Sequence, residues 1–182
     1  MVVSRIAADR KRLAGGIVFG VIGVSNMWQA FVRNWLMAQA KDRLREAQEA
    51  VAQCAGASLE VITTAELSVL AGRSVGEQLR ARRREERPDA VFCANDLLAI
   101  GVLQALTLMG DLAVPQDIAL IGYDDIDFAR SAVIPLSSIR QPSTQIGTAA
   151  IDLLAAAAEV DHKPQHIVYQ PELIVRASTD TR

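Results

Sequence analysis

The 182-residue chain has little of what several protein classes need: two cysteines, two histidines and an aromatic content of only 4%. Because aromatic side chains are scarce, the core must be built from Ala, Leu, Ile and Val, which suits buried parallel strands covered by helices. Cys54 and Cys93 are too few for a disulfide framework, and Cys93 lies in an apolar pattern where a thiol behaves as a small hydrophobe. Both cysteines fit a reducing cytoplasm.

An excess of positive charge is also missing, as is any apolar run of the roughly 20 residues that cross a membrane. The formal net charge of −2 is unlike the basic footprint of a nucleic-acid-binding domain. The one dense basic run, residues 80–87, is better explained as a solvated helix end. Residues 10–24 are similar to a signal peptide, but the nearest Ala-x-Ala, at 38–40, lies well past the apolar run. We therefore expect a cytoplasmic protein without membrane contact.

Motifs of catalysis are absent from the sequence as well. It has no Gly-x-Ser-x-Gly elbow, no phosphate-binding loop and no dinucleotide-binding glycine fingerprint. Asp124, Asp125 and Asp127 superficially resemble a magnesium cluster, but adjacent residues on a strand point to opposite faces of a sheet. His162 and His166 are separated by a proline, so no helix presents them together. We therefore expect no enzymatic activity, no metal and no cofactor.

The apolar pattern alternates between short buried strands and helices. Ala40, Leu44 and Val51 recur on one face of a predicted helix, and Pro88 ends another helical stretch. This alternation predicts an α/β fold with a parallel sheet flanked by helices. The predicted strands cover 29–33, 59–62, 90–94, 118–122, 138–140 and 167–175, and the predicted helices cover 38–54, 66–84, 97–109 and 143–158.

Polar side chains follow two of these strands where each apolar run stops. Asn95 follows the strand at 90–94, and Asp124 follows the strand at 118–122. In an open parallel sheet, ligands bind just outside the carboxyl ends of the strands. Arg43, early in its helix, adds a fork of donors, and Gln141 adds an amide. Because sugar hydroxyls both donate and accept hydrogen bonds, this mixture predicts a pocket for a sugar-like ligand.

Each of these residues also has a purely structural explanation. Asn95 or Asp96 can cap the following helix, and for Asp96 capping is the favoured interpretation. Asp124 and Asp125 can simply end a strand and start a turn. Arg43 can be a surface member of an ion-pair helix, which the pattern alone favours.

Longer stretches of the sequence resemble the effector-binding core of LacI/GalR-type bacterial transcription regulators. They are RPDAVFCANDLLAIG at 87–101, VPQDI at 114–118, IGYDD at 121–125, PLSSIRQP at 135–142 and PELIVRAST at 171–179. The likeness runs from about residue 40 to residue 179. It implies a periplasmic-binding-protein-like fold of type I, here essentially the C-terminal lobe with the returning part of the N-terminal lobe.

The resemblance also implies roles for single residues. Arg43, Asn95, Asp124 and Gln141 match positions that contact the effector in this family. Leu67 falls near the position where many members place an aromatic ring under a sugar, although leucine cannot stack in the same way. No catalytic residue or metal ligand is implied.

The family's organisation divides the chain into three parts. Residues 1–27 are expected to be a remnant of the N-terminal lobe and crossover, 28–137 the C-terminal effector-binding lobe, and 138–182 a returning helix and extended tail. Family members form dimers and bind DNA through an N-terminal helix-turn-helix headpiece that this sequence does not contain. The chain therefore looks like a fragment. We expect it to bind effector weakly or not at all, and not to bind operator DNA specifically.

The predicted function is that of a ligand-sensing core, which binds a small polar effector, sugar-like in chemistry, and controls DNA binding by the headpiece as a homodimer. Three alternatives stay open. A solute-binding protein for sugar transport requires a cleaved signal peptide. A dimerisation-only fragment would pair through 97–109 and 131–136 with an intact regulator. An enzyme would use Asp124 or Asp125 as acid or base, without the usual accompanying motifs.

Overall fold

A six-stranded sheet organises the part of the chain that the computed structural model describes, which is residues 2–6, 49, 51, 53, 57–156 and 167–180. The strand order is β2-β1-β3-β4-β5-β6. The strands are β1 (Val2–Ile6), β2 (Ala57–Val61), β3 (Ala90–Phe92), β4 (Ala119–Tyr123), β5 (Ser137–Arg140) and β6 (Glu172–Ile174). The helices are α2 (Val69–Ala81), α3 (Asp96–Thr107), α4 (Asp127–Ser131) and α5 (Ser143–Ala156), with a 3-10 turn at Arg84–Glu86.

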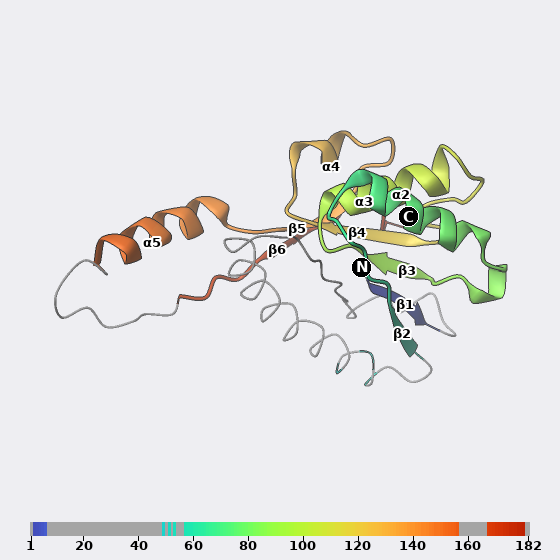
Figure 1. Ribbon diagram of the computed structural model, residues 1–182, viewed down its shortest axis with the longest axis horizontal. Coiled ribbons are helices and arrows are strands. Elements are labelled where there is room, and N and C mark those ends of the chain that lie inside the picture. Colours follow the sequence, from blue (N-terminus) through green and yellow to red (C-terminus); the bar gives the residue numbers. More distant parts are fainter. Residues whose placement is uncertain are drawn as a thin grey trace.

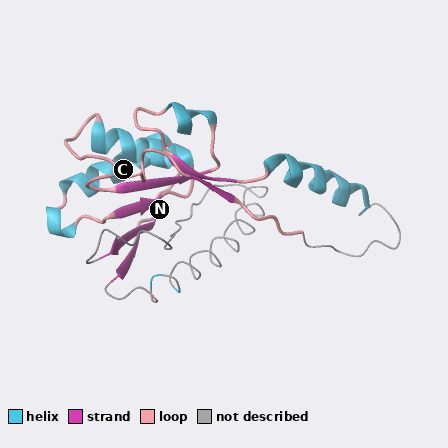
Figure 2. Ribbon diagram, turned by 180° about the vertical axis from the view of Figure 1, so that it is seen from behind, coloured by secondary structure: helices cyan, strands magenta, loops and turns pink. Residues whose placement is uncertain are grey.

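Three strands, β3, β4 and β5, form a parallel centre, as the alternation of strands and helices predicts. The α/β fold is therefore confirmed. The two edges differ from the prediction, because β1 runs antiparallel to both β2 and β3, and β6 runs antiparallel to β5. Helices α2, α3 and α4 lie on one side of the sheet, and α5 extends away from them along the long axis (Figure 1; Figure 2 from behind).

Several predicted elements have different bounds in the structure. The helix predicted at 66–84 begins only at Val69, because Ser68 caps it by accepting a hydrogen bond from the backbone N–H of Ala71. The extended segment predicted at 167–175 is a strand only over β6. The predicted strand at 29–33 and most of the helix at 38–54 lie outside the described residues, although Glu49 and Val51 are helical.

Successive side chains of a strand point to opposite faces of a sheet, so the parallel centre has a core on both of its faces. Val91 and Leu120 face the helices in the main apolar cluster. Phe92 and Tyr123 point to the opposite face, where their rings meet edge to face with centroids 6.5 Å apart. Cys93 belongs to the main cluster, and complete burial raises the pKa of its thiol to about 12. This agrees with its expected role as a small hydrophobe.

The basic run at 80–87 lies where α2 ends and the 3-10 turn follows. Arg82 places two guanidinium nitrogens 2.6 Å from the two carboxylate oxygens of Glu60. Arg83 pairs with Glu85 at 2.8 Å. These contacts support the interpretation of the run as a solvated helix end. Among the described residues, no helix is long and apolar enough to cross a membrane.

Helices α2 and α3 pack so closely that glycine is required where they cross. A Cβ atom on Gly72 would lie 2.1 Å from the carbonyl oxygen of Leu98, and one on Gly101 would lie 2.1 Å from that of Val69. Both obstacles are backbone atoms, which cannot move without separating the helices. The close crossing fixes α3 against α2, and α3 also packs against β4.

Gly72→Ala should therefore lower the free energy of unfolding by about 3 kcal/mol, as overpacking against backbone does. Gly147→Ala in the exposed helix α5 is the matched control, since a Cβ there meets nothing within 4 Å. It should be neutral or stabilise the chain by up to about 1 kcal/mol, because alanine favours helix over glycine. Urea unfolding of the two variants measures the difference, and equal effects would contradict this account of the crossing.

Candidate functional site

The candidate site lies at the carboxyl edge of the parallel strands β3 and β4. Asn95 lies between β3 and α3, and Asp124 directly follows β4. The strands are neighbours in register, with Phe92 opposite Ile121. Two of the predicted polar residues therefore lie at the same edge of the sheet, where open α/β sheets bind their ligands.

Asp124 and Gln141, both predicted site residues, are in direct contact. The Gln141 side chain donates a hydrogen bond from Nε2 to Asp124 Oδ1 at 2.9 Å. Asp124 is exposed and has a φ of 101°, while its backbone N–H donates to the carbonyl oxygen of Ile139 at 2.9 Å. The pKa of the Asp124 carboxyl is raised, mainly because the carboxyl loses part of its hydration. The hydrogen bond from Gln141 opposes this increase, and the charge of Asp96 adds to it.

Asn95 and Leu67 form a second contact at this edge. Asn95 Oδ1 accepts a hydrogen bond from the backbone N–H of Leu98 at 2.9 Å, so Asn95 is the N-cap of α3. Its Nδ2 donates to the carbonyl oxygen of Leu67 at 3.4 Å. Asn95 is buried, and the Leu67 side chain packs partly buried against the core. Arg43, the fifth predicted residue, lies outside the described residues.

The prediction that Asp96 caps α3 is wrong, because its side chain turns away from the helix and toward β5. Asp96 is fully buried. Its Oδ1 accepts a hydrogen bond from Ser138 Oγ at 2.6 Å, and its Oδ2 accepts one from the backbone N–H of Ile126 at 2.8 Å. Burial raises the pKa of Asp96, and these two hydrogen bonds oppose the increase without cancelling it. Asn95 caps the helix in its place.

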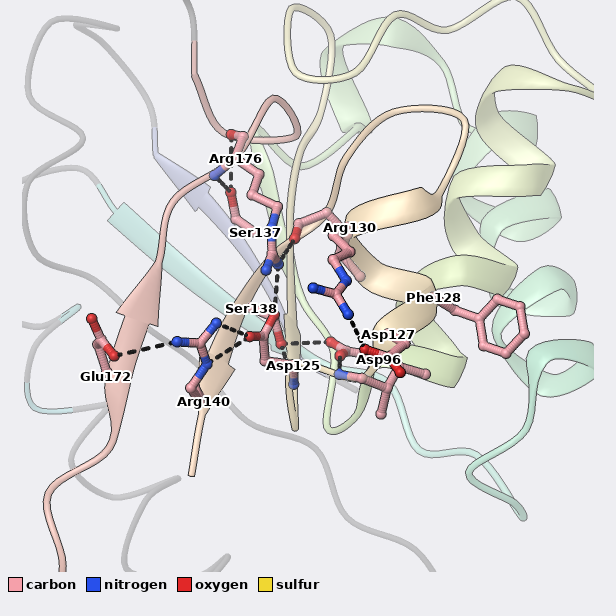
Figure 3. Close-up of polar contacts among 12 residues, drawn as sticks. Asp96, Asp125, Asp127, Phe128, Arg130, Ser137, Ser138, Arg140, Glu172 and Arg176 are labelled. Carbon is pink, nitrogen blue, oxygen red and sulfur yellow. Dashed lines mark hydrogen bonds and ion pairs between the residues drawn. The ribbon is translucent and has the colours of Figure 1, made fainter. Parts of the chain in front are cut away.

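Asp125 binds two arginines from separate segments of the chain (Figure 3). Its Oδ2 lies 2.6 Å from Arg140 Nη2 in β5, and its Oδ1 lies 2.7 Å from Arg176 Nη1 just beyond β6. Arg176 also donates to the carbonyl oxygen of Leu136 at 2.7 Å. Burial alone would raise the pKa of Asp125, but the hydrogen bonds and charges of Arg176 and Arg140 outweigh it, so the pKa is lowered.

The chain turns at Asp124 and Asp125, which both have positive φ, of 101° and 53°. This agrees with the structural explanation that the two residues end a strand and start a turn. Their carboxylates diverge, one toward Gln141 and the other toward Arg140 and Arg176. Among the described residues, no group of three or more His, Cys, Asp or Glu side chains could hold a metal ion. The two carboxylates therefore do not converge on one point.

Sequence reasoning missed most of the residues that support this edge. Ser138, Arg140 and Arg176 contact the turn but were not singled out for a site. Ser138 and Arg140 alternate along one short strand and so point to the same face. Both lie in the stretch PLSSIRQP, and Arg176 lies in PELIVRAST, so the resemblance covered these residues without giving them a role.

A concave region with a volume of about 670 Å³ lies along α5. Its lining comes from α5 and residues 167–169 and includes Thr148, Asp152 and Tyr169. The predicted site residues Leu67, Asn95, Asp124 and Gln141 are not part of this lining. The sequence therefore gives no prediction for this groove, and the predicted residues that the structure describes lie at the sheet edge.

Asp125→Asn should lower the free energy of unfolding at about pH 7 by roughly 3 kcal/mol, because it leaves the mostly buried Arg176 without its partner carboxylate. The folded-state pKa of Asp125 is depressed, so the stabilisation is present above the unfolded-state value of about 4 and is lost as the pH falls through the folded-state pKa. The difference between the variant and the wild type should therefore shrink in acid.

Urea unfolding at about pH 7 and about pH 2 measures this difference. Asp127→Asn is the matched control, because Asp127 forms an exposed ion pair with Arg130 and should contribute little at either pH. A difference for Asp125→Asn that is the same at both pH values would contradict the ionic explanation.

Comparison with known proteins supports the interpretation of the fold. Residues 22–179 match the model of the periplasmic binding protein-like domain. The arabinose metabolism transcriptional repressor of Geobacillus stearothermophilus is 44% identical over 108 residues, which are 58% of this chain and 29% of that protein. The ribose operon repressor of Escherichia coli is 54% identical over 68 residues, 37% of this chain and 20% of that protein.

A solved structure is similar over most of the chain. The LacI family transcriptional regulator of Lactobacillus casei with bound sucrose has a TM-score of 0.59 and 29% identity over 90% of this chain and 57% of that one. The matches to the arabinose and ribose repressors cover less than a third of the length of either protein. These relatives are transcription regulators, in agreement with the prediction that the chain is not an enzyme. The chain belongs to the periplasmic binding protein-like family, and its resemblance is to the LacI-type regulators within it.

Proposed function

We propose that this chain is the ligand-sensing part of a LacI-type transcription regulator and that Asp124 contacts the effector. The observation that carries the proposal is the Asp124–Gln141 contact at the carboxyl edge of the sheet. It presents an exposed carboxylate and an amide side by side, so that hydroxyl groups find both acceptors and donors. Asn95, Leu67 and Arg43 complete the proposed set of ligand contacts.

A sugar is the class of effector that this chemistry fits best. A carboxylate and an amide form strong hydrogen bonds with vicinal hydroxyl groups, and the partly buried Leu67 offers an apolar surface for ring carbons. The relatives named above regulate arabinose and ribose genes, and the Lactobacillus casei regulator holds sucrose. These names support the assignment of a sugar-like effector to the present chain.

The route from ligand to regulation leads through β5 and β6. These two strands pair antiparallel, and the chain passes from β5 into α5, which extends away from the sheet (Figure 1). A ligand at the strand ends would favour one orientation of these segments over another, which is how differential binding shifts a conformational equilibrium. In the proposed regulator, that change would alter how a headpiece outside this chain binds DNA.

The test is a titration of the 182-residue chain with ribose, arabinose, glucose and sucrose, monitored by the amide resonances of a ¹⁵N-labelled sample. At least one sugar should cause saturable shifts at Asp124, Gln141 and Asn95, with the weak affinity expected of this chain. Asp124→Asn keeps the shape and suits the positive φ, but it removes the charge. It should weaken binding about tenfold or more, the cost of losing a charged hydrogen bond.

The matched control is Asp127→Asn, which removes a nearby exposed charge and should leave the titration unchanged. Circular dichroism verifies that both variants fold. If none of the four sugars causes a saturable shift in the wild type, the sugar-sensing proposal is wrong. If Asp124→Asn binds as well as the wild type, the sugar sits elsewhere.

We also propose that two copies of the chain pair through the surface where α3 and α4 begin. The hydrogen bond from the Ile126 N–H to Asp96 holds the starts of the two helices together. Leu97 and Phe128, which follow this junction in α3 and α4, are exposed, with Phe128 71% exposed, and Val133 just after α4 is exposed as well. Large apolar side chains gathered on a surface in this way are typical of protein–protein interfaces. The partner that fits the proposed regulator is a second copy.

Sedimentation velocity should show a concentration-dependent dimer, and Phe128→Ser should shift it toward monomer by about tenfold or more in dissociation constant, as for a central aromatic anchor. Leu70→Ser on α2, where Leu70 is 74% exposed, is the control and should have no effect. A wild-type chain that stays monomeric at high concentration would refute the pairing.

A further inference from the structure

We propose that the buried Asp96–Ser138 pair positions the ligand-binding carboxylate of Asp124 by fixing the turn that carries it. The pair is defined by the hydrogen bond from Ser138 Oγ to Asp96 Oδ1, at 2.6 Å. Both residues are fully buried, so they act on the site from beneath and do not reach the ligand. The inference rests on the proposed function of Asp124, and it assigns a role to two residues outside the predicted ligand set.

The turn needs external support because its conformation is unfavourable for the residues that form it. Asp124 and Asp125 have φ values of 101° and 53°, in the region that favours glycine. Two consecutive residues of this kind persist only where the surrounding structure determines their backbone. Without that support, the turn would relax and the Asp124 carboxylate would move away from Gln141.

The support comes from hydrogen bonds that two consecutive backbone N–H groups of the turn donate. The Asp125 N–H donates to Ser138 Oγ at 3.0 Å, and the Ile126 N–H donates to Asp96 Oδ2 at 2.8 Å. Ser138 in turn donates its hydroxyl hydrogen to Asp96 Oδ1. One carboxylate thus holds two successive N–H groups, one directly and one through the serine hydroxyl.

Two other residues allow this arrangement: one leaves room for the Asp96 carboxylate, and the other caps α3 so that Asp96 does not have to. A Cβ atom on Gly122 would lie 2.0 Å from Asp96 Oδ1, so only glycine in β4 admits the carboxylate beside the strand. Asn95 caps α3, which leaves the Asp96 side chain available for the turn. Three positions of the sequence are therefore adjusted to a single buried carboxylate.

The ion pairs of Asp125 are a separate set of contacts at the same turn. Arg140 and Arg176 bind the Asp125 side chain, whereas the backbone N–H groups of Asp125 and Ile126 donate to Ser138 and Asp96. Loss of the ion pairs leaves those backbone hydrogen bonds in place. The effects of Asp125→Asn and of changes at Ser138 can therefore be distinguished by the backbone amides.

The first experiment needs no sugar. In Ser138→Ala, amide hydrogen exchange at Asp125 should become about tenfold faster, and the side-chain amide resonances of Gln141 should move toward those of a free glutamine. Asp96→Asn is the second variant, in which one oxygen remains to serve two donors, and it should loosen the amides of both Asp125 and Ile126. The matched controls are Ser131→Ala and Asp127→Asn, both on the exposed side of α4.

A thermal melt of each variant separates positioning from general stability. If Ser138→Ala or Asp96→Asn lowers the melting temperature but leaves the turn amides and the Gln141 resonances unchanged, the pair is merely structural and the inference is overturned. Exchange and resonances are recorded far below the melting temperature, so that global unfolding does not contribute. Asp125→Asn, measured beside them, should leave the exchange of the Asp125 and Ile126 amides within about twofold of the wild type.

The second experiment repeats the titration of Ser138→Ala with whichever of ribose, arabinose, glucose and sucrose shifts the wild-type spectrum most. Affinity should fall about tenfold, because the Asp124 carboxylate is no longer held in place. Unchanged affinity would overturn the inference while leaving the proposed function standing. If instead the turn loosens as described but no sugar binds the wild type, the proposed function fails and the structural part of the inference stands.

Discussion

The arrangement of the sheet edge depends on the burial of one carboxylate, that of Asp96. A buried acid is costly unless every lone pair that faces the protein has a donor, and here a serine hydroxyl and a backbone N–H supply them. This requirement explains Ser138 in β5 and glycine at position 122 in β4. It also explains why the preceding residue, Asn95, and not Asp96, caps α3. Substitution of any of these residues affects the others.

Much of the fold could be predicted because its strongest features are local. The buried strands β3 and β4 are short apolar runs bounded by polar residues, and Ser68 caps the start of the helix α2 that precedes them. The remaining elements depend on distant partners. Strand β1 has no distinctive pattern and exists through its pairing with β2 and β3, while the five-residue helix α4 is too short for a periodicity to show.

The candidate site was predictable in part for the same reason. The rule that parallel strands present their carboxyl ends at one edge correctly brought Asp124 and Asn95 to that edge, and the resemblance added Gln141. The rule does not say which of two neighbouring polar residues caps the helix, and the prediction for Asp96 failed there. That choice is made by Ser138 and the Ile126 N–H, which approach Asp96 only in the folded chain.

The two adjacent acids of the turn make different sets of contacts. Asp124 faces solvent and Gln141, while Asp125 binds Arg140 in β5 and Arg176 just beyond β6. A displacement of the turn by a ligand would therefore act at once on both strands that flank α5 in the chain. Because the ion pairs of Asp125 are short and the Asp125 and Arg176 side chains are largely shielded from water, the turn and the two strands should move as one body. No long pathway of coupled residues is needed between a ligand on Asp124 and a change in strand orientation.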